Sequence, residues 1–130
     1  TYSEWHKKNC ELNGFSKKQY AIITSDVMQF LKTNKSKYDM IVCDPPSFSQ
    51  SKRKGVGLFQ IQDHANALIN ACFKSLKKDG RILFSTNYRK FNMDKAKGGS
   101  GWQTKEITQS LCPKDFDGKW MSRCWEIMAP

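Results

Sequence analysis

An apolar run in the first half of the chain ends abruptly at an acid and two prolines. Residues 40–43 form a short apolar run typical of a strand covered on both faces. Pro45 and Pro46 cannot continue a strand, because each lacks a backbone N–H and has a fixed φ. Asp44 is therefore predicted to lie at the carboxyl end of a buried strand. Ligands of open α/β sheets bind at that edge, so Asp44 and Phe48 are candidates to hold a flat, hydrogen-bonding substrate; a simple strand-terminating turn is the alternative.

Helical and extended patterns alternate along the rest of the chain. Apolar spacing and the glycine at position 14 predict a helix over roughly the first dozen residues. Residues 94–101, rich in Lys and Gly, are predicted to form a mobile loop. The remaining patterns predict a short helix capped by Asp26, a long helix over residues 61–76, and strands over 20–24, 81–86, 104–108 and 123–128. Helices between strands predict the α/β class with a mostly parallel sheet.

The charge balance favours a polyanionic partner. The chain has 130 residues, which is room for one domain with one core. Its formal net charge is +10, because 22 Lys and Arg outnumber 12 Asp and Glu. Such an excess is typical of nucleic-acid binding, although it is also found as a solubility trait or a compositional bias. The densest basic cluster, residues 52–54, follows the Asp44 loop directly, which favours nucleic acid.

Cysteine and histidine positions indicate neither disulfides nor a metal site. The five cysteines form no C-x-x-C pair and lie mostly in apolar runs, as expected of reduced, buried thiols in the cytosol. His6 and His64 lie far from each other and from a second ligand at zinc-like spacing, so both are interpreted as helix residues. No membrane span or signal peptide is recognisable, so we expect a soluble, cytoplasmic protein with no membrane partner.

Several short motifs resemble a known enzyme family. The order of elements, with acids following strands, resembles the carboxyl-terminal part of a class I S-adenosylmethionine-dependent methyltransferase. A closer resemblance is to the large-subunit ribosomal RNA guanine methyltransferases, in particular the guanine-N7 half of the bifunctional bacterial enzyme. It extends over nearly the whole chain and is carried by Asp44-Pro45-Pro46-Ser47-Phe48-Ser49-Gln50-Ser51-Lys52-Arg53, Asp63-His64, Phe84-Ser85-Thr86-Asn87, Glu106-Ile107-Thr108-Gln109, Asp115-Phe116 and Cys124-Trp125.

The same resemblance implies that parts of the domain are absent. A complete enzyme of this class begins with two further strands and a glycine-rich turn that holds the cofactor. Residues 98–101 offer a glycine cluster, and without a strand-turn-helix context they are interpreted as a linker. We therefore expect residues 1–130 to form a partial methyltransferase catalytic domain with an incomplete Rossmann-like sheet. The missing amino-terminal half, on the same or another chain, is an expected partner, and the fragment is expected to be inactive alone.

The resemblance implies roles for residues at the predicted strand ends. Asp44, Pro45, Pro46 and Phe48 would form the reaction centre, where Asp44 and the Pro45 carbonyl accept hydrogen bonds from a base. Phe48 would stack on that base, although burial in the core is the alternative. Cys43 precedes the motif and is interpreted as structural. Guanine N7 is favoured by the residue pattern, whereas an acceptor such as Asp44 would suit the exocyclic N2.

S-adenosylmethionine is the implied cofactor. Asp26 and Val27 would contact its adenine, and Asp44 and Pro45 would also contact the cofactor; for Asp26, an ordinary N-cap is the alternative or an additional role. No metal is expected. The residues implied to contact phosphates of ribosomal RNA, or else to be solvated surface charges, are Lys52, Arg53, Lys54, Arg89 and Lys90.

The predicted function is therefore S-adenosylmethionine-dependent N-methylation of a guanine in 23S ribosomal RNA. N7 is favoured and N2 is the alternative atom. Two other functions remain possible for the chain. It is either a non-catalytic RNA-binding remnant that cannot hold the cofactor, or one half of a split methyltransferase that is active only with its other half.

Overall fold

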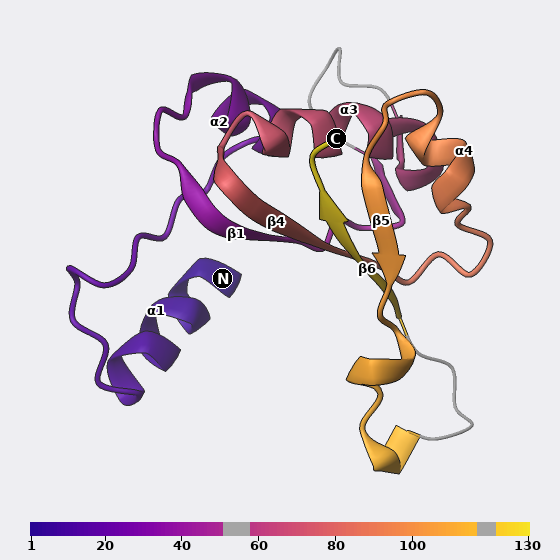
Figure 1. Cartoon of the computed structure of the whole chain (residues 1–130). Coiled ribbons are helices and arrows are strands. Elements are labelled where there is room, and N and C mark those ends of the chain that lie inside the picture. Colours follow the sequence, from indigo (N-terminus) through magenta and orange to yellow (C-terminus); the bar gives the residue numbers. More distant parts are fainter. Residues whose placement is uncertain (51–57, 117–121) are drawn as a thin grey trace.

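The computed structural model describes residues 1–50, 58–116 and 122–130 (Figure 1). Among these residues the predicted α/β class is confirmed. The elements are α1 (Tyr2–Leu12), α2 (Val27–Thr33), β1 (Tyr38–Cys43), β2 (Phe48–Gln50), β3 (Leu58–Gln60), α3 (Ile61–Phe73), β4 (Leu76–Thr86), α4 (Met93–Lys97), β5 (Gln103–Glu106), the 3-10 helices η1 (Gln109–Leu111) and η2 (Lys114–Phe116), and β6 (Arg123–Met128).

Four strands form the main sheet in the order β1-β4-β6-β5 within the described ranges. Strand β1 runs parallel to β4, whereas β4 with β6 and β5 with β6 are antiparallel. The expectation of a mostly parallel sheet is therefore wrong. A parallel pair needs a long crossover, which α3 supplies between β1 and β4, but β5 and β6 are joined without such a crossover and pair as antiparallel neighbours.

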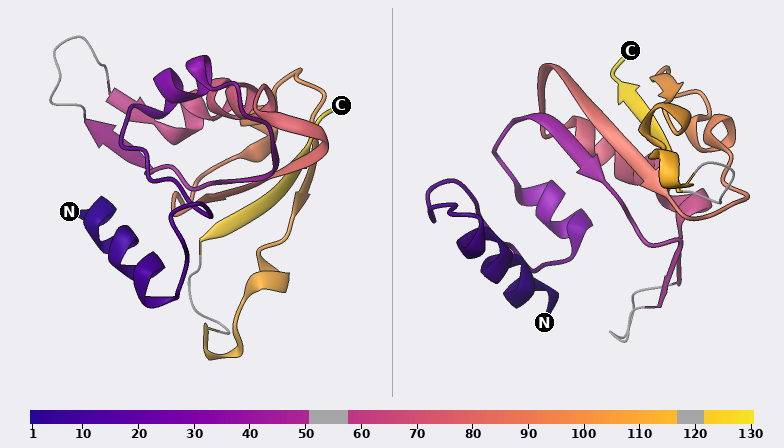
Figure 2. Two further views of the ribbon diagram at one scale, coloured as in Figure 1. Left: turned by 90° about the vertical axis from the view of Figure 1, so that its left-hand side faces the viewer. Right: turned by 90° about the horizontal axis from the view of Figure 1, so that it is seen from below.

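Helices α2, α3 and α4 cover one face of this sheet (Figures 1 and 2). The apolar stripe of α3 faces the sheet because its buried residues recur three and four positions apart. From the sheet, every second residue of β4 points into the same core. The fully buried side chains here include Ile61, Ala65, Ile69, Ile82, Phe84 and Ile127.

The opposite face of the sheet carries exposed apolar side chains. Met40 and Val42 of β1 are 49% and 70% exposed. Helix α1 lies apart from the sheet on this side (Figure 2), and its Trp5 is 64% exposed. A side-chain hydrogen bond of 2.9 Å joins Ser3 in α1 to Thr24. Strand β1 is also the edge strand of the described sheet, so one side of its backbone lacks a strand partner there.

Two predicted strands differ in their bounds, since β4 begins at Leu76 instead of at residue 81 and β5 covers Gln103–Glu106 instead of 104–108. Three other predictions differ more. The segment Tyr20 to Thr24 is not a strand, because no other strand of the described chain lies beside it to accept its backbone hydrogen bonds. The long helix ends at Phe73 instead of at Leu76, which already belongs to β4. Residues 94–101, predicted as a mobile loop, begin within helix α4, whose Ala96 is buried against the core.

Helix α1 and the short α2 confirm the corresponding predictions. The side chain of Thr1 caps α1 with Glu4 in a reciprocal capping box, and Gly14 follows the helix with a φ of +72°. His6 and His64 lie in helices, as expected. In the part of the chain that the structure describes, no helix has the length and apolarity needed to cross a bilayer.

Candidate active site

Asp44 follows β1 directly at the carboxyl end of that strand. The last paired residues of β1 and β4 are Cys43 and Phe84, so Asp44 lies across from Ser85 on the neighbouring strand. The Ser85 hydroxyl donates a hydrogen bond of 2.6 Å to Asp44 Oδ1. The Asp44 carboxylate is exposed to solvent. An acceptor is thus presented at the sheet edge where the sequence places it, while its role in binding stays a prediction.

The two prolines lead the chain from Asp44 into an aromatic pair. Pro45 is half-buried and Pro46 is exposed. Phe48 is 56% exposed and meets Tyr88 edge to face, with ring centroids 5.6 Å apart. A backbone hydrogen bond of 3.1 Å from Ile61 to the Ser47 carbonyl fixes the loop to the start of α3. Phe48 is therefore not a core residue, and its ring remains accessible for stacking.

Phe48 begins a two-stranded antiparallel hairpin that sequence patterns did not predict. Strands β2 and β3 pair with Phe48 opposite Gln60. Between them lie Lys52, Arg53 and Lys54, which fall outside the described residues, so their predicted contacts with RNA stay predictions. Arg89 and Lys90 are exposed and follow the carboxyl end of β4, at the same edge of the sheet as Asp44.

Asp26 and Val27 lie at the start of α2, where Val27 lines a small hollow. Asp26 Oδ1 accepts a hydrogen bond of 2.9 Å from the Gln29 backbone and so caps α2. The ordinary capping role is thus present, and Oδ2 is not needed for it. Val27 is 52% exposed and lines a hollow of about 130 Å³. The hollow is formed by Ile23, Ser25, Val27 and Phe30.

Cys43 lies next to Asp44 in sequence but faces the core. It is buried against Cys72 of α3. A hydrogen bond with the Cys72 thiol, together with burial, raises the pKa of the Cys43 thiol far above its ordinary value. Cys43 is therefore a neutral core residue, as the sequence interpretation expected. No cluster of three or more His, Cys, Asp or Glu suited to a metal is found in the described ranges.

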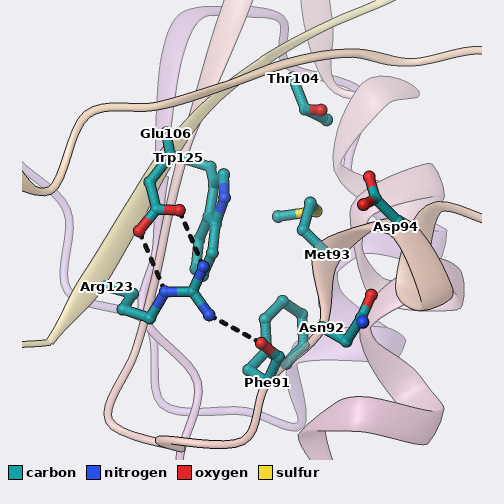
Figure 3. A pocket seen from close by; sticks show the side chains of 8 residues that line it. All are labelled: Phe91, Asn92, Met93, Asp94, Thr104, Glu106, Arg123 and Trp125. Atoms are coloured by element: carbon teal, nitrogen blue, oxygen red, sulfur yellow. Dashed lines mark hydrogen bonds and ion pairs between the residues drawn. The ribbon is translucent and has the colours of Figure 1, made fainter.

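A larger pocket that the sequence did not suggest lies between α4 and strands β5 and β6 (Figure 3). Its volume is about 280 Å³. Arg123 donates two hydrogen bonds to the Glu106 carboxylate, of 3.0 and 2.8 Å, and a third of 2.8 Å to the Phe91 carbonyl. Its guanidinium also lies 4.5 Å from the centre of the buried Trp125 ring. Through these three hydrogen bonds Arg123 joins β5 and β6 to the segment that precedes α4.

The Glu106–Arg123 pair makes the stability of the fold depend on pH. Hydrogen bonds from Arg123 hold the pKa of Glu106 below its ordinary value of 4.5. A carboxyl whose pKa is lower in the folded state stabilises the fold above its unfolded pKa and loses that contribution as pH falls through the folded value. We expect Glu106→Gln to lose less stability than the parent between pH 7 and pH 3, as measured by urea unfolding. Equal losses in both proteins would contradict this.

Comparison with known proteins identifies relatives. No family model matches the chain. It is 39% identical over 130 residues to ribosomal RNA large subunit methyltransferase K of Neisseria meningitidis serogroup B. This alignment covers 98% of the chain and 36% of the relative. It is 42% identical over 120 residues to ribosomal RNA large subunit methyltransferase K/L of Hydrogenovibrio crunogenus, covering 89% of the chain and 16% of the relative. The chain is thus similar to part of each of these methyltransferases and spans well under half of their length.

Solved structures agree on the fold. The chain matches SMU.776, described as a methyltransferase and crystallised with SAH, with a TM-score of 0.68 and 21% identity over 91% of the chain and 34% of that protein. A SAM-dependent methyltransferase from Agrobacterium tumefaciens matches with a TM-score of 0.66 and 22% identity, over 96% of the chain and 44% of that protein. The chain thus shares the fold of part of each of these two proteins and spans less than half of their length.

Proposed function

We propose that residues 1–130 form part of the catalytic domain of an S-adenosylmethionine-dependent ribosomal RNA methyltransferase. One observation carries the proposal: an exposed carboxylate, Asp44, follows the carboxyl end of β1 in a methyltransferase-like sheet, and the same loop leads to an exposed aromatic ring, Phe48. Ligands of open α/β sheets bind at this edge. The names of the relatives support ribosomal RNA as the substrate.

The residues around Val27 suit the adenine end of S-adenosylmethionine. The hollow beside Val27 offers an apolar surface to a flat ring, and Asp26 Oδ2 can accept a hydrogen bond from the adenine amine. The hollow is formed by four residues of one short segment and has a volume of about 130 Å³. We infer that residues outside it hold the methionine end, in agreement with a partner half that carries the glycine-rich turn.

The exposed apolar surface beside β1 suits such a partner half. Met40 and Val42 project from an edge strand, and helix α1, whose Trp5 is exposed, lies on the same side of the sheet. Unpaired strand edges of this kind readily accept further strands. We infer that an amino-terminal part of the same protein, or a separate chain, covers this surface and completes the cofactor site. The surface equally suits the split-enzyme alternative.

In this proposal the protein's main task is to position the target base. When bound, the cofactor would supply an electrophilic methyl group; a base nitrogen would form a bond to the methyl carbon as the carbon–sulfur bond breaks and the thioether leaves. Asp44 accepts a hydrogen bond from the base, and Phe48 stacks on its face after the base has left the RNA stack. Pro45 and Pro46 hold both groups in place, since neither residue has freedom in φ.

We propose a guanine of 23S ribosomal RNA as the target, with N7 as the methylated atom and N2 as the alternative. N7 is supported by the resemblance of the motifs, and N2 by the acceptor character of Asp44, which suits a nitrogen that bears hydrogens. Phosphates would be held by Arg89 and Lys90, and by the basic cluster Lys52, Arg53 and Lys54.

A chimera tests the proposal directly. The chain would replace the matching segment of the Neisseria meningitidis relative, and circular dichroism would confirm folding. We expect this chimera to bind S-adenosylmethionine in calorimetry and to transfer a tritiated methyl group to 23S ribosomal RNA, whereas the chain alone does neither. A folded chimera that neither binds nor transfers would overturn the proposal.

Two matched variants locate the cofactor within the chimera. Val27→Asp places a charge against the proposed adenine surface and is expected to weaken cofactor binding at least about tenfold. Met28→Asp, at a neighbouring residue of α2 that is 41% exposed and does not line the hollow, serves as the control. Equal weakening in both variants would contradict the assignment of Val27.

A further inference from the structure

The hydrogen bond between Ser85 and Asp44 lies where the two strands of the parallel pair end. Pairing of Cys43 with Phe84 brings Asp44 and Ser85 together one residue further on. Side chains alternate between the faces of a sheet, and Cys43 and Phe84 are buried in the core. Asp44 and Ser85 therefore both point to the opposite, uncovered face.

The polarity of this hydrogen bond is fixed by chemistry. An ionised carboxylate only accepts, so the Ser85 hydroxyl must donate. At 2.6 Å the bond has the length of a charge-assisted hydroxyl–carboxylate bond. It occupies Oδ1 of Asp44, and within the described residues no hydrogen bond to Oδ2 is found, so Oδ2 can accept one from an incoming base. An exposed aspartate without such a partner would exchange among staggered rotamers.

The position of the Ser85 hydroxyl is fixed by the sheet. Its strand, β4, lies between β1 and β6 in the sheet, and Ser85 itself is paired with Cys124 of β6. Cys124 is held in turn by backbone hydrogen bonds, from its own amide to Thr108 Oγ1 (3.0 Å) and from the Ile107 amide to its carbonyl (2.9 Å). A donor on a central strand is displaced less easily than one on a loop.

We propose that Ser85 is a positioning residue that selects the rotamer of Asp44 and aims its other oxygen, Oδ2, at the target base. This inference rests on the proposed function. The alternative is that the hydroxyl only helps to join β1 to β4. That joining is already provided by the backbone ladder, and at the opposite end of the same strands by an ion pair of 2.9 Å between Lys77 and Asp39.

The first experiment needs no enzymatic activity. Three-bond NMR couplings report the χ1 rotamer of Asp44 in the 130-residue chain. We expect one rotamer in the parent, averaging among rotamers in Ser85→Ala, and one rotamer again in Ser85→Thr, which restores a hydroxyl. A single Asp44 rotamer in Ser85→Ala would overturn the inference.

The second experiment measures turnover in the chimera described above. Ser85→Ala is expected to lower kcat about tenfold with the KM for RNA unchanged, because the base still binds but is poorly aligned. Ser85→Thr should recover most of this loss. Lys77→Met, which removes the other side-chain link between β1 and β4, should keep the parent kcat.

The outcomes separate the inference from the function on which it rests. An equal loss of kcat in Lys77→Met and Ser85→Ala, or no loss in Ser85→Ala, would show that Ser85 does not position Asp44. If the parent chimera transfers no methyl group, the proposed function fails, and the rotamer measurement alone decides whether Ser85 orients Asp44.

Discussion

Asp44→Asn is expected to lower the methylation rate of the chimera about 100-fold at saturating cofactor. Asparagine keeps the shape of the side chain, and its carbonyl oxygen can still accept the hydrogen bond from Ser85. Its amide nitrogen then occupies the position of Oδ2 and presents hydrogens where the base needs an acceptor. A misaligned nucleophile forfeits the rate gained from orientation, and misplacement by about 1 Å costs about 100-fold.

The matched control is Asp39→Asn, on the same strand. Asp39 is a carboxylate at the other end of β1, and its side chain is 83% exposed and paired with Lys77. Its replacement should leave methyl transfer within about twofold of the parent, since an exposed ion pair contributes little. Because Asp44 is also predicted to contact the cofactor, calorimetry on Asp44→Asn separates a loss of binding from a loss of turnover. Equal rates in the two variants would remove Asp44 from the reaction centre.

The site was more accessible to sequence reasoning than the fold around it. An apolar run followed by two prolines is a local signal, so the position of Asp44 at a strand end could be read without knowing what surrounds it. Ser85 and Tyr88, in contrast, meet Asp44 and Phe48 only through the pairing of β1 with β4. Ser85 belongs to one of the motifs in the sequence, but its hydrogen bond with Asp44 follows only from the register in which β1 and β4 pair.

The errors in predicted elements have a common cause. The pattern of Tyr20 to Thr24 is that of a strand, yet strand formation depends on a neighbour that the described chain does not place there. The start of β4 could not be predicted, because Lys77 and Lys78 are typical of the end of a helix. In the structure Leu76 pairs with Tyr38, so this segment is part of the sheet. Tertiary partners decided both cases over local preference.

Short elements were also missed where capping and packing supply the stability. Helix α4 is only five residues long, and the Asn92 side chain caps it through a hydrogen bond of 2.7 Å from the Lys95 amide. Its Met93 and Ala96 are buried, which offsets the glycines that follow. The pocket next to it depends on Arg123 and Glu106, which come from two strands far apart in sequence. Nothing local in the sequence links them.

Phe84→Ala is expected to destabilise the chain by about 3 to 5 kcal/mol, the range measured for aromatic truncations in cores. Phe84 is fully buried, and its ring lies 5.3 Å from that of Phe91 and 6.1 Å from that of Trp125. Domains of this size are stable by about 5 to 15 kcal/mol, so the loss is a large share of the total.

Urea unfolding of Phe84→Ala beside Leu83→Ala measures this loss, and the comparison bears on the site itself. Leu83 is the preceding residue of β4 and lies half-buried on the other face, so its truncation should cost about 1 kcal/mol. If Phe84→Ala does not fold, Phe84→Leu, with a smaller cavity, should show an intermediate loss. Equal losses for Phe84→Ala and Leu83→Ala would mean that the core beneath β4 is not packed as described. Since Phe84 directly precedes Ser85, that core is also what fixes the donor to Asp44 in place.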